Sequence, residues 1–125
     1  MNLVRVVAAI IKKGNQYLIV QRNRNKHLGL KWEFPGGKVH DNETFEEALS
    51  REIKEELNIT INIHEKIAEE KYKDDKIDIV LYYYLCSLKN GMMKLNEHEN
   101  FAWVEKKDFN KYDFAEGDGN ILSLL

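Results

Sequence analysis

The 125-residue chain is long enough for one compact domain, which would remove roughly two thirds of the unfolded surface from water. Hydrophobic residues make up 43% of the chain, charged residues 32%, and there is one proline, so the composition excludes a disordered or fibrous protein. The formal charge of -2 offers no overall positive field for a nucleic acid polymer. A small anionic ligand would therefore need a local cation.

Cysteine usage and hydropathy together predict a cytoplasmic protein. Cys86 is the only cysteine, so no internal disulfide can form, which fits a reducing compartment. The apolar run from Val6 to Ile11 is far too short to span a bilayer, and Lys12-Lys13-Gly14 is not a small-residue cleavage site. We expect no membrane partner, and nothing in the sequence indicates an oligomeric state.

The first third of the chain has the pattern of β-strands. Val4–Ile11 and Tyr17–Val20 are apolar runs separated by Lys13-Gly14-Asn15, which predicts two buried strands joined by a tight turn. Trp32–Phe34 predicts a short strand that Pro35-Gly36-Gly37 stops. The two glycines also allow close backbone approaches that a Cβ atom would block.

The next segment is the clearest helix, from Thr44 to Leu57, with no glycine or proline inside it. Its large apolar residues recur every four positions, which is the spacing of one buried helix face. Thr44 followed by Glu47 three residues later has the form of a capping box. Asp41-Asn42 just before it are also good cap residues, so the start of the helix stays open over a few positions.

Beyond the helix, β-type patterns return. Ile59–Ile63 alternates apolar and polar residues, and Ile77–Leu88 is a longer β-type run. We expect the charged stretch Glu69–Lys76 to form the solvated end of a hairpin. Asn90-Gly91 is a strong hairpin signal that predicts a further turn there.

The chain closes with a predicted strand at Phe101–Val104 and a predicted helix at Ile121–Leu125. No linker, internal repeat or low-complexity segment divides the chain. Residues 1–125 are therefore predicted to form a single α+β domain around a mixed β-sheet.

The predicted helix carries an unusual density of carboxylates. Glu52, Glu55 and Glu56 are three or four residues apart, so they project from neighbouring points on one side of the helix. Such like charges repel one another, and a hard divalent cation such as magnesium would resolve that conflict. The alternative is a solvated charged face, which is common in soluble proteins.

The order of these residues resembles a known family motif. Gly37, five residues, Glu43, seven residues and then 51–59 (Arg-Glu-Ile-Lys-Glu-Glu-Leu-Asn-Ile) resemble the Nudix box. Every defined position matches except Asn58, where the family has glycine. Asn also tolerates the left-handed backbone that ends a helix, so the departure is mild.

The segment 32–38 (Trp-Glu-Phe-Pro-Gly-Gly-Lys) is similar to the one that precedes the box in the MutT-type branch and in the related CTP pyrophosphohydrolases. This resemblance implies a Nudix fold, an α/β/α sandwich around a mixed sheet. It also implies a magnesium-dependent hydrolase that cleaves a nucleoside triphosphate into the monophosphate and pyrophosphate, with manganese as a possible substitute. The NADH and ADP-ribose branches carry further prolines, and Pro35 is the only one here.

Carried over residue by residue, the resemblance implies that Glu52, Glu55 and Glu56 bind the metal with the Gly36 carbonyl. Arg51 and Glu43 would orient and neutralise this cluster. A further carboxylate, Glu97, would be a metal ligand or the base that deprotonates water, unless it is merely exposed.

The remaining glutamates of the helix and the histidines are not assigned a role in the site. We expect Glu46 and Glu47 to be solvated, or Glu47 to pair with Arg51. The histidines show no ligand spacing and are interpreted as ordinary polar residues; they are His27, His40, His64 and His98.

The same resemblance implies that Arg22, Phe34 and Asp118 contact the base, and that Lys38 touches a phosphate unless it is solvated. Phe34 could instead be core, and Asp118 a helix cap. The base remains open between 8-oxoguanine and cytosine. Two rival functions are a catalytically idle Nudix-fold module that senses nucleotides or binds a partner, and a hydrolase of another nucleoside diphosphate derivative.

Overall fold

A mixed sheet of seven strands organises the computed structural model, which describes residues 2–115 and 118–125. The strands are β1 (Leu3–Lys13), β2 (Gln16–Gln21), β3 (Trp32–Glu33), β4 (Gly36–Lys38), β5 (Thr60–Lys73), β6 (Asp78–Asn90) and β7 (Asn100–Glu105). The main order is β3-β2-β1-β6-β5, with β4 paired to β1 and β7 paired to β2. β1 runs parallel to β6 and antiparallel to β2 and β4, so the sheet is mixed as predicted.

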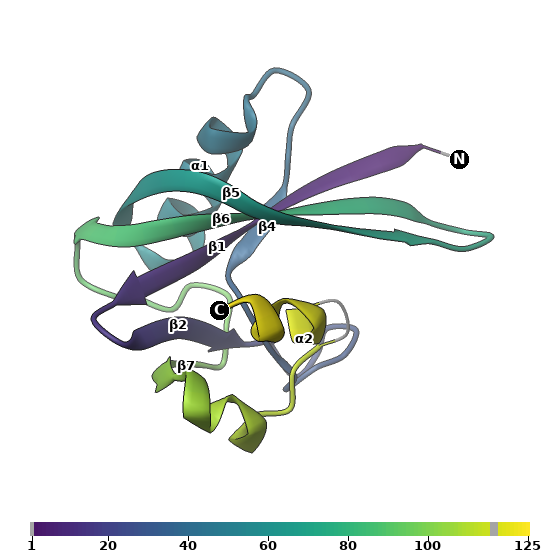
Figure 1. The fold of residues 1–125 in the computed structure, drawn as a ribbon. Helices are drawn as coiled ribbons and strands as arrows, with labels where there is room; N and C mark the ends of the chain where they lie inside the picture. Colours follow the sequence, from purple (N-terminus) through teal and green to yellow (C-terminus); the bar gives the residue numbers. More distant parts are fainter. Residues whose placement is uncertain (1, 116–117) are drawn as a thin grey trace.

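Alternation along β1 divides the core between the two faces of the sheet. Val7, Ala9 and Ile11 pack in the cluster that contains the apolar face of helix α1 (Phe45–Leu57). Ala8 and Ile10 belong to the opposite cluster. That second face is covered by the short helical segments Lys106–Lys111, α2 (Asp118–Ile121) and Leu122–Leu124, together with Tyr112 and Phe114. Figure 1 shows α1 and α2 on opposite sides of the sheet, which confirms the predicted α+β class.

Both ends of α1 follow the sequence prediction. The Thr44 side chain accepts from the Glu47 backbone N–H and the Glu47 carboxylate accepts from the Thr44 N–H, which completes the capping box. At the other end, Asn58 adopts φ = 60°, and its backbone N–H donates to the Lys54 carbonyl. The asparagine in the glycine position of the box therefore makes the left-handed turn that was expected of it.

The Pro-Gly-Gly loop differs in part from its prediction. β3 ends before Pro35, but Gly36 and Gly37 begin another strand, β4, which pairs antiparallel with β1. A Cβ atom on Gly36 would lie 1.9 Å from the Val7 carbonyl oxygen. Glycine is thus required here by the close approach of two strands.

The hairpin end is shorter in the structure than the predicted stretch Glu69–Lys76. β5 continues to Lys73, which pairs with Asp78, so only residues 74–77 turn. The turn is closed by Asp74, whose Oδ1 accepts from the backbone N–H groups of Lys76 and Ile77. The backbone ladder with β6 keeps the charged stretch extended, and the two strands form the arm that projects from the body of the molecule in Figure 1.

Asn90-Gly91 is not a hairpin turn, so that prediction was wrong. The segment that follows crosses the C-terminal end of α1, and no strand begins until Asn100. There Lys94 N donates to the Leu57 carbonyl and Asn96 N to the Glu56 carbonyl. The last carbonyls of a helix have no donor inside the helix, and this segment supplies donors for them.

The C-terminal predictions are close to the structure. The strand at Phe101–Val104 is confirmed within β7, whereas the final helix begins earlier, at Asp118, and continues as a 3-10 turn. Residues 116 and 117, just before it, lie outside the described part of the chain. Within that described part, no helix has the length and apolar composition needed to cross a membrane.

Candidate active site

One cavity of about 570 Å³ lies where β4, α1, the loop before β7 and α2 meet. Its lining contains all the candidate site residues: Arg22, Phe34, Gly36, Lys38, Arg51, Glu52, Glu55, Glu56, Glu97 and Asp118. The segment that crosses the end of α1 brings Glu97 to this cavity, and the short α2 brings Asp118. Residues far apart in the sequence therefore share one cavity.

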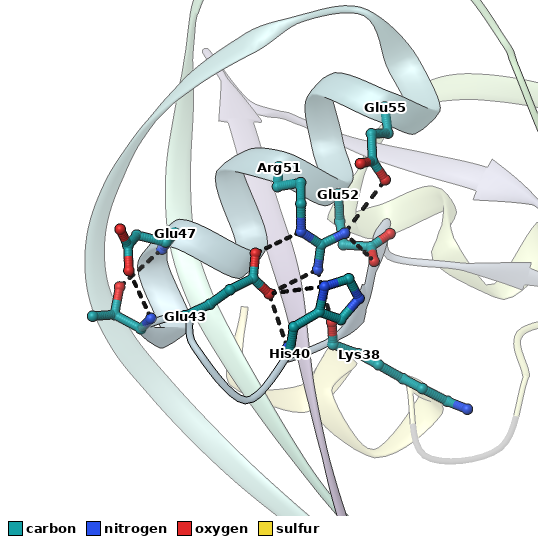
Figure 2. A network of polar contacts seen from close by, with 8 residues as sticks. Lys38, His40, Glu43, Glu47, Arg51, Glu52 and Glu55 are labelled. Carbon is teal, nitrogen blue, oxygen red and sulfur yellow. Dashed lines mark hydrogen bonds and ion pairs between the residues drawn. The ribbon is translucent and has the colours of Figure 1, made fainter.

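Arg51 is the centre of a hydrogen-bond network on the cavity wall (Figure 2). Its guanidinium makes a two-pronged contact with Glu43, with Nε 2.6 Å from Oε2 and Nη2 2.9 Å from Oε1. The same guanidinium reaches Glu52 Oε1 at 2.9 Å and Glu55 Oε2 at 3.3 Å. This pairing lowers the pKa of Glu43 to about 2, first through the hydrogen bonds from Arg51.

The Arg51 network does not include the side chains of Glu46, Glu47 and Lys38. Glu47 accepts from the Thr44 N–H and lies apart from Arg51 in Figure 2, so the suggested pairing of Glu47 with Arg51 was wrong. Glu46 is exposed, as expected. Lys38 contributes its carbonyl oxygen to Arg51 at 3.1 Å, while its ammonium group extends away from the network.

Glu56 differs from the other carboxylates of the helix because it is buried. The residue is 6% exposed, and Oε1 finds no hydrogen-bond partner within residues 2–115 and 118–125. Burial raises the pKa of Glu56 to about 9, and the negative charges of Glu52, Glu97 and Glu33 add to the shift. A cation bound beside such a buried acid would stabilise its ionised form and satisfy the unpaired oxygen.

The donor atoms fit a hard divalent cation. Glu52, Glu55, Glu56 and the Gly36 carbonyl offer oxygen only, which is the donor that magnesium prefers. A Cβ atom on Gly37 would lie 2.3 Å from Glu52 Cδ, so only glycine lets this carboxylate reach the loop. No three acidic, histidine or cysteine side chains of the described residues yet converge as metal ligands. Glu52 and Glu55 are instead held by Arg51, and Glu55 would have to turn from it.

The loop before β7 contributes two side chains of different character. Glu97 is half exposed at the cavity rim, with Oε2 3.8 Å from the Lys26 ammonium group. The His98 side chain is only 8% exposed and lines the cavity, with Nε2 3.4 Å from Glu33 Oε2. Its Nδ1 is buried and has no hydrogen-bond partner among the described residues. The sequence analysis did not place His98 at the cavity, and only its position next to Glu97 could have indicated this.

Asp118 also lines the cavity and joins α2 to the sheet through two hydrogen bonds. The residue is 6% exposed; Oδ2 accepts from the Phe34 N–H at 2.9 Å and Oδ1 accepts from the Tyr83 hydroxyl at 2.5 Å. Burial raises the pKa of Asp118 to about 7, although both hydrogen bonds act in the opposite direction. Both donors lie outside α2, so these hydrogen bonds connect α2 to the rest of the domain.

The two other predicted base contacts are already in contact with protein groups. Phe34 is 3% exposed and packs edge-on against Phe109, so its ring is part of the core as well as of the cavity lining. Arg22 donates from Nη1 to Glu33 Oε1 and from Nε to the His27 carbonyl, both at 2.9 Å. These contacts fix the orientation of Arg22 at the cavity wall.

Comparison with known proteins agrees with this arrangement. The NUDIX domain family matches residues 1–125. The CTP pyrophosphohydrolase of Escherichia coli strain K12 is 31% identical over 125 residues, covering 100% of this chain and 93% of that protein. The 8-oxo-dGTP diphosphatase of the same strain is 28% identical over 126 residues, covering 100% of this chain and 98% of that protein.

Among solved structures, a solution structure from methicillin-resistant Staphylococcus aureus 252 is described as DNA mismatch repair protein MutT, of the Nudix hydrolase family. It superposes with a TM-score of 0.79 at 34% identity, covering 98% of this chain and 95% of that one. The fold, the sequence of the box and these relatives agree on one class of protein, in which a single helix bears the carboxylates of the site. The chain belongs to the NUDIX domain family.

Proposed function

We propose that the protein is a divalent-metal-dependent hydrolase that converts a nucleoside triphosphate and water into the nucleoside monophosphate and pyrophosphate. The observation that carries this proposal is Glu56, a buried acid with an unpaired oxygen, which lines the same cavity as Arg51, Glu52 and Glu55. The names of the Escherichia coli relatives, a CTP pyrophosphohydrolase and an 8-oxo-dGTP diphosphatase, support the reaction class.

Glu52, Glu55, Glu56 and the Gly36 carbonyl would hold the cation, which we propose to be magnesium, with manganese able to replace it. When bound, the cation polarises the phosphate oxygens and offsets charge on the departing pyrophosphate. Arg51 keeps Glu52 in place through the 2.9 Å hydrogen bond, and Glu43 balances the charge of Arg51. Both residues therefore act by positioning the ligands.

In the proposed reaction, water attacks a phosphorus atom inside the triphosphate, and the bond to the pyrophosphate oxygen breaks. The proton released by water passes to a carboxylate, for which Glu97 is our candidate because it is half exposed at the cavity rim. Lys38 is proposed to contact a phosphate, since its ammonium group is free of the Arg51 network in Figure 2. No covalent intermediate is required.

Arg22, Phe34 and Asp118 are proposed to bind the base, because they line the same cavity as the carboxylates of α1. A free nucleotide, and not a nucleic acid polymer, is the proposed substrate. The two bases that these residues would suit are 8-oxoguanine, in 8-oxo-dGTP, and cytosine, in CTP or dCTP.

The test is a panel of nucleoside triphosphates and nucleoside diphosphate derivatives assayed with magnesium for both phosphate and pyrophosphate. We expect pyrophosphate and a nucleoside monophosphate as the first products from 8-oxo-dGTP, dCTP or CTP. Inorganic phosphate and a diphosphate as first products would contradict the proposed bond cleavage. Tight nucleotide binding without any turnover would instead favour a sensing module.

A further inference from the structure

The Tyr83 hydroxyl is a buried polar group that the proposed reaction does not use. Tyr83 lies on β6 with 0% of its surface exposed, and its hydroxyl donates to Asp118 Oδ1 at 2.5 Å. The other oxygen of the carboxylate, Oδ2, accepts from the Phe34 N–H at 2.9 Å. Each oxygen of Asp118 therefore has one protein donor before any ligand enters the cavity.

These two donors are chemically different. The backbone N–H of Phe34 can only donate, so Oδ2 is held as an acceptor. A phenol hydroxyl can donate or accept. If Asp118 is ionised, Tyr83 donates to it. Protonation of Oδ1 would make that oxygen a weaker acceptor for the Tyr83 hydroxyl, so the hydrogen bond favours the ionised carboxylate, which shows the cavity only acceptors.

We propose that Tyr83 is a positioning residue that selects the base, because its hydroxyl keeps Asp118 a hydrogen-bond acceptor toward the cavity. This inference rests on the proposed function. An acceptor-only Asp118 suits a guanine-type edge, with its N1–H and N2 amino donors, whereas the N3 atom of cytosine requires a donor. Tyr83 thereby favours 8-oxo-dGTP over dCTP.

The groups around the pair shift the pKa of Asp118 in both directions. The Tyr83 hydrogen bond lowers the pKa of Asp118, so removing the hydroxyl would raise it further above its ordinary value. Glu33 raises the pKa of Asp118, and Arg22 lowers it. The pKa of Tyr83 itself is raised by burial and then by the negative charges of Asp118, Glu70 and Glu33, so the phenol keeps its proton.

The deciding experiment compares kcat/KM for 8-oxo-dGTP and dCTP in the wild type and in Tyr83→Phe. We expect the 8-oxo-dGTP to dCTP ratio to fall by about five- to tenfold, the effect of one altered hydrogen bond. For 8-oxo-dGTP, the rise of kcat/KM with pH should move to higher pH in the variant. Tyr84→Phe is the matched control, since the Tyr84 hydroxyl lies 3.5 Å from Glu46, away from Asp118.

Equilibrium binding of 8-oxo-dGMP and dCMP is measured on the same proteins, so that the role of Tyr83 is tested even if no triphosphate is cleaved. A fall in the binding ratio supports the proposal whatever the turnover. Equal weakening of both nucleotides, or an unchanged ratio, overturns it. Absent turnover with an altered binding ratio would contradict the proposed function alone.

If Tyr83→Phe does not fold, Asp118→Asn is the second variant. An amide cannot titrate, so the ratio for the two bases should lose the pH dependence that the wild type shows near neutral pH. A pH dependence that persists unchanged in Asp118→Asn would overturn the proposal.

Discussion

Glu56 and Asp118 are two buried carboxyl groups that line one cavity. Both are 6% exposed, and burial raises the pKa of each, to about 9 for Glu56 and about 7 for Asp118. Their hydrogen-bond partners differ. Glu56 Oε1 has no hydrogen-bond partner among the described residues, while the oxygens of Asp118 accept from the Phe34 N–H and the Tyr83 hydroxyl.

The difference shows that burial alone does not define what a carboxyl group can bind. Glu56 is surrounded by the charges of Glu52, Glu97 and Glu33, so a cation is the ligand that lowers its energy. Asp118 is already satisfied and fixed in orientation, so it can distinguish ligands by their donors and acceptors. Glu56 is therefore suited to bind a cation, and Asp118 is suited to recognise the hydrogen-bond pattern of a ligand.

Removal of divalent cations should have the largest effect. Among residues 2–115 and 118–125, Arg51 is the one cation that forms an ion pair with the carboxylates of α1. We therefore expect a chelator to abolish turnover and added magnesium to restore it. Manganese should restore it as well. The check is pyrophosphate release before chelation, after chelation and after metal is added back; turnover that survives chelation would contradict the metal site.

Glu56→Gln should lower kcat by orders of magnitude while the fold is retained. The amide removes the anionic oxygen that would bind the cation but keeps the side-chain volume, so circular dichroism should be unchanged. Glu52→Gln should behave likewise. Glu46→Gln, on the exposed surface of the same helix, is the matched control and should retain near wild-type turnover. Near wild-type turnover in Glu56→Gln would remove Glu56 from the site.

Stability of the metal-free protein should fall as pH rises, by up to a few kcal/mol. An acid whose pKa is higher in the folded state stabilises the fold at low pH, and this contribution is lost as pH rises through the folded pKa. The contribution of Asp118 to the free energy of unfolding falls as pH rises to about 7, and the contribution of Glu56 continues to fall up to about pH 9. Each pKa unit corresponds to about 1.4 kcal/mol.

Urea unfolding with a chelator present, at pH values from about 5 to about 9, measures this slope. Glu56→Gln should flatten the upper part of the curve and Asp118→Asn the lower part, since each removes one titrating group. A metal-free protein whose stability rises over this range would show that neither group has a raised pKa.

The sequence predicted what depends on local pattern. The capping box at Thr44 and the left-handed turn at Asn58 are set by neighbouring residues, and both were confirmed. Asn90-Gly91 has an equally strong local signal, yet it failed, because the unpaired carbonyls of α1 bind the following segment. Local chemistry does not show which distant group will need a donor.

The same reason explains which site residues were missed. Tyr83 lies within three consecutive tyrosines of one β-type run, and only the pairing of β6 with its neighbours directs its hydroxyl to Asp118. His98 enters the cavity because the crossing segment places it there. The family motif, by contrast, identified residues of α1 whose spacing alone places them on one side of the helix.

Substitution of the satisfied carboxyl group should affect base selection and not metal dependence. Asp118→Asn should change the ratio of kcat/KM for 8-oxo-dGTP and dCTP by more than about tenfold, because one mismatched hydrogen bond is worth roughly 1–3 kcal/mol. An amide offers a donor and an acceptor at once, so the two bases cannot respond equally. The metal dependence should be unchanged, since Asp118 is not one of the proposed metal ligands. Steady-state kinetics on both substrates with a magnesium titration provides the measurement. If both substrates lose activity equally and the melting temperature falls, Asp118 only joins α2 to the sheet, and the contrast with Glu56 would be one of stability and not of recognition.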